Sequence, residues 1–125
     1  MICGLGIDSV EVERIENIIT RWGDRFIKRI YGEDEQRYCE GKTYPYQHYA
    51  ARFAVKEAFL KCLGCGIGDG VAFNQIEVAL DSRGKPSLRL HGAAEKALTR
   101  IDAAAAHVSL THTMHYASAV VILER

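Results

Sequence analysis

Apolar and polar positions divide the chain into short strands and helices. Residues 2–8 form an apolar run with glycines at 4 and 6, which predicts a strand that another backbone approaches closely. Between residues 12 and 26, apolar side chains recur every three or four positions, which predicts a helix with a charged outer face. The apolar stripe of this helix comprises Val12, Ile15, Ile19, Trp22 and Phe26.

Three further helices follow from composition and from end signals. Acidic residues at its start predict a short helix over residues 33–40, because carboxylates stabilise the positive end of the helix dipole. An alanine-rich segment predicts a long helix from Tyr46 to Leu63, ending at Gly64. Another helix is expected over residues 93–104, with Ala94, Leu98 and Ile101 buried.

The remaining segments predict the strands of a sheet. Residues 73–81 and 87–90, joined by a turn at 82–86, predict a hairpin. Residues 107–113 alternate between apolar and polar, whereas residues 117–123 are apolar on both faces, which predicts a central strand. Because strands and helices are mixed without regular βαβ alternation, the pattern predicts an α+β fold in which an antiparallel sheet packs against the long helix.

Length and charge narrow the class of protein. The 125 residues, of which 48% are hydrophobic and 26% charged, suit one domain over 1–125 that buries a core. Sixteen basic residues balance sixteen acidic ones, which argues against a non-specific nucleic-acid binder. The apolar run at 119–123 is far shorter than the ~20 residues of a membrane-spanning helix, and the N-terminus lacks the basic-then-apolar pattern of a signal peptide. We therefore expect a cytoplasmic protein with no membrane partner.

The four cysteines are irregularly spaced, which argues against a disulfide framework. Cys62 and Cys65 have the spacing of half a zinc site or of a redox pair, but no second pair occurs at ligand spacing. Buried or incidental thiols are the favoured interpretation. The glycine-rich loop at 64–70 is either a helix stop or a loop whose backbone a ligand approaches.

Two carboxylates are the first candidates for chemistry. Asp8 ends the glycine-containing strand, and Glu57 lies in the middle of the long helix between Lys56 and Lys61. Without histidine or cysteine beside them, these carboxylates suit a hard cation such as Mg²⁺, which also takes water and phosphate oxygens. From spacing alone, a structural interpretation is favoured, in which Asp8 caps the following helix and Glu57 pairs with Lys61.

Basic and hydroxyl side chains elsewhere fit a phosphate ligand. Arg52 and Lys56 share one stripe of the long helix beside the stripe of Glu57, where two cations would offset the charge of a pyrophosphate. Thr111 and His112 lie on a predicted strand, and both side chains can donate to a phosphate. The alternatives are a solvated face for the two cations and a hydrogen-bonded core position for His112.

A basic segment follows the first strand and predicts a protein-binding surface. Residues 14–29 contain five basic and two acidic side chains. Spacings of three or four residues form a mixed basic and apolar ridge that fits an acidic helical partner. Its members are Arg14, Ile18, Arg21 and Arg25. For any single charge of the ridge, a solvated face is the alternative.

Four segments of the chain carry a family resemblance. They are GIDSVEVERI at 6–15, RFAVKEAFLKCLGCGIG at 52–68, GKP at 84–86 and VSLTHT at 108–113. Together they resemble the small phosphopantetheinyl transferases of the holo-acyl-carrier-protein synthase family, with R-F-x-x-K-E-A-x-x-K as the specific part. The resemblance makes the metal site the favoured interpretation of the two carboxylates. Ser9 and Val55 depart from the residues usual there, which concerns local packing only.

The resemblance implies that an enzyme transfers the 4′-phosphopantetheine arm of coenzyme A to a serine of apo acyl carrier protein, releasing adenosine 3′,5′-bisphosphate. Asp8 and Glu57 would bind Mg²⁺ with the pyrophosphate, and Lys61 would lie near the phosphates. The implied nucleotide contacts are Arg52, Lys85, Pro86, Thr111 and His112, the last two at the 3′-phosphate. A homotrimer with sites between subunits is also implied, and its first helix would bind the carrier protein, which fits the ridge.

The implied mechanism leaves one step open. The serine would be deprotonated by Glu57 or by a metal-bound water before in-line attack on the β-phosphate. Lys61 would then stabilise the departing bisphosphate. The competing functions are a non-catalytic carrier-protein or coenzyme A binding module and another Mg²⁺-dependent phosphotransferase. Retention of both carboxylates and Lys61 argues against the binding module.

Overall fold

The computed structural model describes residues 1–64 and 70–125 of the chain. Its main sheet has the strand order β1-β5-β4, and both neighbouring pairs are antiparallel. The strands are β1 (Ile2–Glu11), β4 (Ala105–His112) and β5 (Tyr116–Glu124). The strand near the C-terminus is central, which confirms the prediction from its two apolar faces. The first strand continues beyond Asp8 to Glu11.

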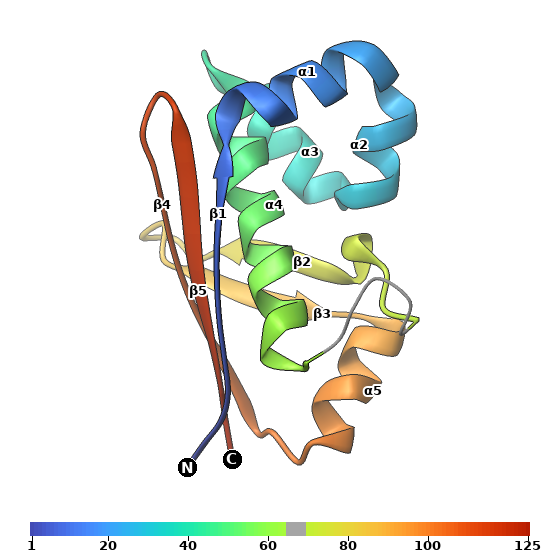
Figure 1. Ribbon diagram of the computed structural model, residues 1–125, viewed down its shortest axis with the longest axis vertical. Helices are drawn as coiled ribbons and strands as arrows, with labels where there is room; N and C mark the ends of the chain where they lie inside the picture. The colour runs from blue at the N-terminus through green and yellow to red at the C-terminus, as the bar shows by residue number, and fades with distance from the viewer. Residues whose placement is uncertain (65–69) are drawn as a thin grey trace.

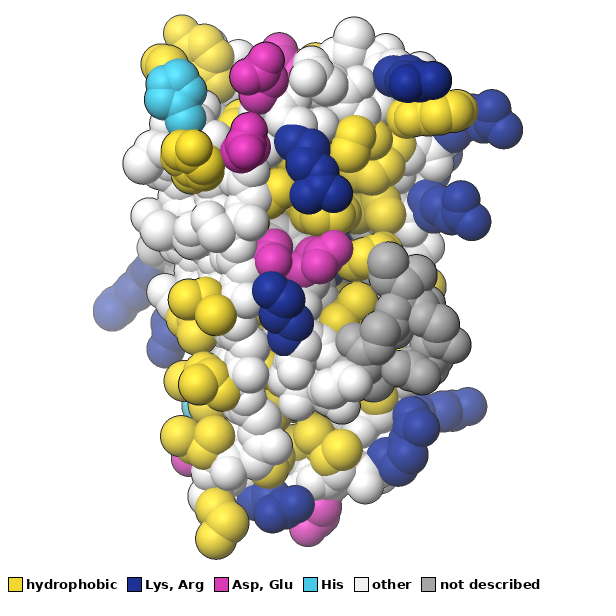
Figure 2. All heavy atoms as spheres, in the orientation of Figure 1, with side chains coloured by type: hydrophobic (Ala, Val, Ile, Leu, Met, Phe, Trp, Pro, Cys, Tyr) yellow, Lys and Arg dark blue, Asp and Glu magenta, His cyan; other side chains and the backbone are white. Residues whose placement is uncertain are grey.

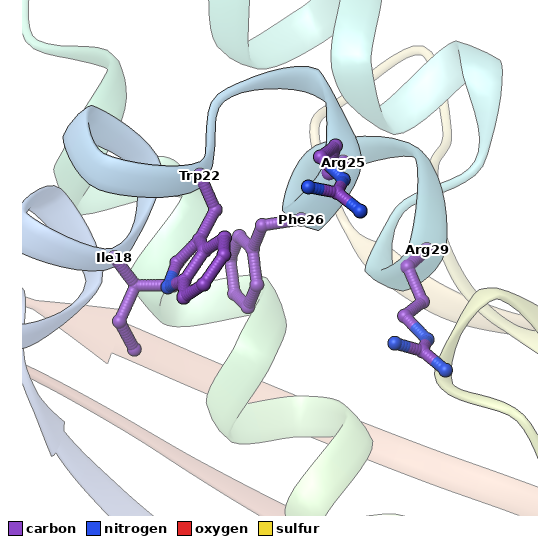
Figure 3. A pocket seen from close by; sticks show the side chains of 5 residues that line it. All are labelled: Ile18, Trp22, Arg25, Phe26 and Arg29. Carbon is purple, nitrogen blue, oxygen red and sulfur yellow. The ribbon is translucent and has the colours of Figure 1, made fainter.

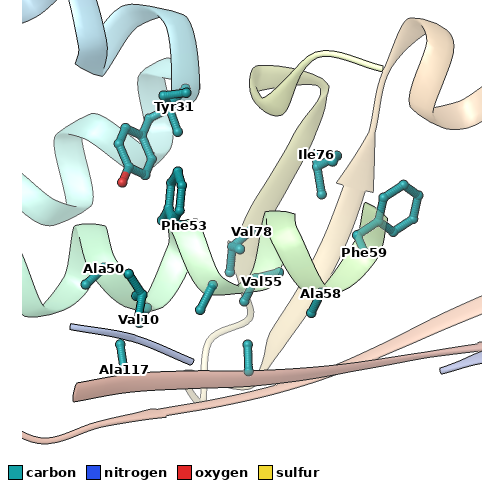
Figure 4. Close-up of a cluster of buried hydrophobic side chains, with 14 of the residues drawn as sticks. Val10, Tyr31, Ala50, Phe53, Val55, Ala58, Phe59, Ile76, Val78 and Ala117 are labelled. Carbon is teal, nitrogen blue, oxygen red and sulfur yellow. The ribbon is translucent and has the colours of Figure 1, made fainter. Parts of the chain in front are cut away.

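The long helix α4 (Pro45–Cys62) packs along the main sheet and forms the centre of the molecule (Figure 1). Its side chains are buried on almost every side, which its run of small alanines permits. Figure 4 shows core side chains of α4, such as Ala50 and Phe53, in one cluster with Ala117 of the sheet and with Tyr31 and Ile76 from other elements. The predicted α+β fold, with an antiparallel sheet against a long helix, is confirmed.

The predicted helix over residues 12–26 is two helices, α1 (Val12–Trp22) and α2 (Asp24–Ile30). Gly23 separates them with φ 57° and ψ −133°, a conformation that only glycine adopts without strain. The apolar stripe therefore ends early, and Trp22, which it assigned to the core, is 49% exposed. Helix α3 (Glu33–Glu40) has the predicted bounds, and the three helices gather around one end of α4 (Figure 1).

The predicted hairpin is present as β2 (Ile76–Leu80) and β3 (Pro86–Leu90), which form a second, two-stranded sheet. Its first strand begins later than predicted, because Phe73–Gln75 form a 3₁₀ turn in which the Gln75 side chain accepts from the Ala72 amide.

The last helix, α5 (Gly92–Arg100), ends before the alanine run does, and the chain then turns at Asp102 with φ 59°. Of the residues predicted to be buried, Ala94 is fully enclosed, whereas Leu98 and Ile101 are half-buried. No helix within the described ranges is both long and apolar enough to cross a membrane.

Candidate active site

Asp8 and Glu57 come together where β1 crosses α4. Lys61 Nζ donates to Asp8 Oδ1 at 3.1 Å and to the Ile7 carbonyl oxygen at 3.0 Å. Burial and then the negative charge of Asp8 raise the pKa of Glu57. The charges of Lys61 and Arg14 oppose this rise, so two cations border the pair of carboxylates. Figure 2 shows acidic side chains near the middle of this face, with basic side chains above and below them.

Glycines in β1 set the short distance between the strand and the helix. A Cβ atom on Gly6 would lie 1.9 Å from the Ala58 carbonyl oxygen, and one on Gly4 would lie 2.8 Å from that of Cys62. No side chain fits in these gaps, which confirms the expected close approach. The strand thereby carries Asp8 to the side of the helix from which Glu57 projects.

The structural interpretation of the two carboxylates is wrong. Helix α1 has Glu11 as its N-cap residue, and no side chain caps it, so Asp8 is not a helix cap. Lys61 pairs with Asp8 and not with Glu57. Within residues 1–64 and 70–125, no ion pair includes Glu57. Asp8 and Glu57 thus lie close enough for the charge of Asp8 to act on Glu57.

Lys56 does not belong to this place, contrary to the expectation that it faces a pyrophosphate. Its side chain is fully buried, and Nζ donates to Glu35 Oε1 at 2.7 Å and to the carbonyl oxygens of Phe73 (3.2 Å) and Ile76 (2.5 Å). Burial lowers the pKa of Lys56, and the charge of Glu35 opposes this shift. Lys56 is a structural residue that fastens α4 to α3 and β2.

A second group of predicted residues lines a cavity of about 180 Å³ on α4, β3 and β4. Arg52, Pro86 and His112 line it together with His48 and Tyr38. Arg52 is 3% exposed, and its guanidinium lies 4.2 Å from the centroid of the Tyr38 ring. Among the described residues, Arg52 Nε is a buried polar atom without a hydrogen-bond partner. His112 is half-buried and lies against His48, with ring centroids 4.8 Å apart.

Thr111 does not join this cavity. Successive residues of a strand point to opposite faces, so Thr111 is exposed on the outer face of the main sheet while His112 faces inward. Of this pair, only His112 therefore lines the Arg52 cavity within one chain. Lys85 is exposed in the turn before β3, where its amide donates to Asp81 Oδ1 at 2.9 Å.

The two groups of residues lie on different sides of α4. Arg52 and Glu57 are five positions apart, which places them about 140° apart around the helix axis. The strands that complete the groups, β1 with Asp8 and β4 with His112, are the two edges of the main sheet. One chain therefore holds two separate parts of the predicted site.

The predicted partner surface is split between two helices. Arg14, Ile18 and Arg21 lie on α1, and Arg25 lies on α2. Ile18 and Arg25 line a groove of about 400 Å³, toward which Trp22, Phe26 and Arg29 also project (Figure 3). The sequence pattern assigned Trp22 and Phe26 to the apolar stripe and not to the partner surface, because it continued the stripe through Gly23. The glycine itself was the signal that a turn separates them.

The thiol of Cys62 fits the interpretation as a buried cysteine. Cys62 Sγ donates to the Val121 carbonyl oxygen at 3.1 Å, and burial raises the pKa of this thiol to about 11. A thiol that stays protonated at neutral pH is a poor nucleophile. Cys65 and residues 66–69 of the glycine-rich loop lie outside the described residues.

Comparison with known proteins places these residues in a family. The model of the 4′-phosphopantetheinyl transferase superfamily matches residues 4–120. The chain belongs to this superfamily. A holo-[acyl-carrier-protein] synthase of Syntrophus aciditrophicus is 46% identical over 124 residues, which cover 99% of this chain and 97% of that one.

Solved structures of such transferases have the same fold. The holo-[acyl-carrier-protein] synthase of Neisseria meningitidis matches with a TM-score of 0.91 and 32% identity, covering 100% of both chains. The synthase of Bacillus anthracis, solved in complex with CoA (3′,5′-ADP), matches with a TM-score of 0.81 and 38% identity over 99% of this chain and 97% of that chain. The resemblance inferred from the four motifs is confirmed for the transferase family.

Proposed function

We propose that the protein transfers the 4′-phosphopantetheine arm of coenzyme A to a serine of apo acyl carrier protein. The observation that carries this proposal is the convergence of Asp8, Glu57 and Lys61 from β1 and α4, in a chain of the transferase family. The serine oxygen forms a bond to the β-phosphorus, and the pyrophosphate bond breaks. Adenosine 3′,5′-bisphosphate then leaves.

Asp8 and Glu57 would hold Mg²⁺, which when bound offsets the charge of the pyrophosphate. The donor set fits this ion, because a cation relieves the repulsion from Asp8 that, after burial, raises the pKa of Glu57. No cluster of three or more His, Cys, Asp or Glu side chains that could hold a metal occurs in the part of the chain described. Two carboxylates leave room for water and phosphate oxygens, which Mg²⁺ prefers to a full protein cage.

The chain's own side chains carry the remaining steps. The serine hydroxyl would give its proton to Glu57 or to a water held at the metal site. Lys61, held beside Asp8 by its hydrogen bond, offsets charge on the departing bisphosphate. Arg14 borders Glu57 and also begins the basic ridge, so a carrier bound on α1 would present its serine at this site. Trp22 and Phe26 add apolar contact to that surface.

A homotrimer would complete the site. The outer face of the main sheet exposes apolar side chains, with Leu5 64% and Ile7 67% exposed, and the sheet register places Ile122 and Val120 beside them. Covering this face with further copies would set Asp8 and Glu57 of one copy near the Arg52 cavity of another. The nucleotide would then bind to Arg52, Lys85, Pro86, Thr111 and His112 of a neighbouring copy. The cytoplasmic location stays a prediction.

Mass measurement tests the transfer directly. The carrier, incubated with the protein, Mg²⁺ and coenzyme A, is expected to gain the mass of one phosphopantetheine arm. An unchanged carrier mass, with coenzyme A still bound, would leave the binding module as the function. Modification of a free nucleotide, with the carrier unchanged, would establish another phosphotransferase.

Replacing Glu57 tests the base and the metal site together. Glu57→Gln is expected to lower turnover by about 10²–10⁴-fold, because the amide neither accepts the proton nor carries the charge. Glu95→Gln, on the exposed face of α5, should leave turnover unchanged. Near-normal rates for Glu57→Gln would refute the assignment.

Replacing Lys61 separates chemistry from binding. Lys61→Ala is expected to lower kcat by about 10²-fold, and to weaken coenzyme A binding much less, because the charge it offsets develops in the transition state. Steady-state kinetics and calorimetric titration give the two quantities, with Lys96→Ala as the control. Equal losses of kcat and affinity would argue against this role.

A further inference from the structure

His48 faces the cavity of Arg52 and His112 but was not among the residues predicted from sequence. It lies on α4, one turn before Arg52, and its carbonyl oxygen accepts from Arg52 Nη1 at 3.4 Å. Its ring makes edge-to-face contacts with two other rings. The His48 centroid lies 5.6 Å from the Tyr38 centroid and 4.8 Å from the His112 centroid. The imidazole is thus fixed in place by contacts from α3 and β4.

The walls of this cavity are positive and contain no acidic side chain among the residues described. Arg52 supplies a permanent charge, and Lys42 Nζ lies 4.5 Å from the centroid of the Tyr38 ring. Leu80, Pro86 and Leu110 form the apolar part of the walls. The space is about 180 Å³, several times the ~30 Å³ share of one water molecule, so it admits a phosphate group.

Two independent features of the cavity indicate an anionic ligand. Arg52 is almost fully buried, yet its Nε has no partner among the described residues, and such a donor costs free energy unless a ligand accepts from it. The groups that face His48 are His112, Arg52 and Lys42, all of them basic, together with the Tyr38 ring. An arrangement of cations and imidazoles without a carboxylate suits a phosphate monoester.

We propose that His48 is a specificity-determining residue of this cavity. The His48 ring takes up a proton when the phosphate monoester of the nucleotide enters the cavity, and it binds this phosphate as an imidazolium. The proposal rests on the proposed function, because it assumes that the phosphate belongs to the nucleotide part of coenzyme A. Beyond the proposed function, it assigns His48 to nucleotide binding and couples that binding to the uptake of one proton.

The direction of the proton transfer follows from the charges. Without a ligand, burial and then the nearby charges of His112, Arg52 and Lys42 lower the pKa of His48 to about 4, so the ring is neutral at pH 7. A bound phosphate opposes the positive charges around His48 and favours the charged ring. Binding is therefore tighter at lower pH, down to the second phosphate pKa near 6, where the ligand itself gains a proton. A ligand without this phosphate lacks the effect.

The test compares adenosine 3′,5′-bisphosphate with adenosine 5′-monophosphate, which lacks the 3′-phosphate. The ratio of their affinities is expected to rise by about three- to tenfold between pH 8 and pH 6.5 for the full chain, since one proton contributes at most tenfold per pH unit. Titration calorimetry in buffers of different ionisation enthalpy should show proton uptake with the bisphosphate only.

Two variants of His48 test whether this side chain takes up the proton. His48→Phe keeps a ring against Tyr38 and His112 but cannot titrate, and His48→Gln keeps a donor without a charge. Both should hold the affinity ratio at its pH 8 value and take up fewer protons. His91→Gln, which alters an exposed histidine beside Glu77, should behave like the unaltered protein.

The outcomes separate this proposal from the proposed function. A ratio that does not change with pH, or one that still rises in both His48 variants, overturns the role of His48, even with normal transfer to the carrier. Failure of the unaltered protein to bind either nucleotide and to modify the carrier at any pH would overturn the proposed function itself. Unfolding midpoints of the variants exclude misfolding as the cause of a lost response.

Discussion

At the scale of single residues, lysines of one helix have opposite environments. Lys56 is fully enclosed and paired with Glu35, whereas the Lys61 side chain is 54% exposed and donates to Asp8. Position on the helix decides this difference, because five positions correspond to about 140° around the axis. Lys56 serves stability and Lys61 serves the site, although both are basic residues beside Glu57.

The buried pair gives a prediction about stability. Lys56→Met is expected to lower the free energy of unfolding by about 3–5 kcal/mol, because Glu35 would keep a buried charge without its cation. Denaturation by urea measures this loss. Lys28→Met breaks the exposed Lys28–Asp24 pair, whose charged atoms are 3.9 Å apart, and should cost no more than ~1 kcal/mol. A similar cost for both variants would contradict the role of Lys56 as the fastening residue.

At the scale of elements, the packing of β1 on α4 holds the two carboxylates together. The glycine at position 6 is required by a backbone contact and not by its φ angle, because a Cβ would meet the Ala58 carbonyl oxygen at 1.9 Å. Strand and helix would have to move apart to admit even a methyl group.

The same contact predicts the effect of a single methyl group. Gly6→Ala is expected to lower the free energy of unfolding by about 3 kcal/mol or more and to reduce transfer, since it separates Asp8 from Glu57. Urea denaturation and carrier modification would show both effects. Gly41→Ala is the matched control: Gly41 has φ −76°, its nearest contacts would be 3.5 Å away, and the change should be neutral or stabilising by up to ~1 kcal/mol. Tolerance of Gly6→Ala would mean that the contact does not set the spacing.

At the scale of the whole molecule, the exposed apolar face of the main sheet predicts self-association. Leu5→Lys is expected to yield a species with the mass of one chain, 13.9 kDa, and to reduce transfer at low protein concentration. Activity should recover as the concentration rises, by mass action. Light scattering after size exclusion measures the mass, with Thr99→Lys as the control. Full activity of a monomeric Leu5→Lys variant would show that one chain suffices.

The sequence by itself determined the types of the elements and the chemistry available to them. Periods of two and of three to four residues encode local geometry, so the central strand, the long helix and the α+β fold could be predicted. The carboxylates at 8 and 57 and the motif around residue 57 indicated phosphate transfer. These features depend on neighbours in the chain.

Only the tertiary structure decided which of these residues share a place. Four features depend on elements that are far apart in sequence. They are the burial of Lys56, the exposure of Trp22, the pairing of Lys61 with Asp8 and the contact of His48 with His112. Residue spacing does not indicate how α4 is rotated about its axis relative to the sheet, or which face of the sheet packs on the helix. Those are set by packing across the whole core, where a glycine in β1 and the alanines of α4 allow one arrangement.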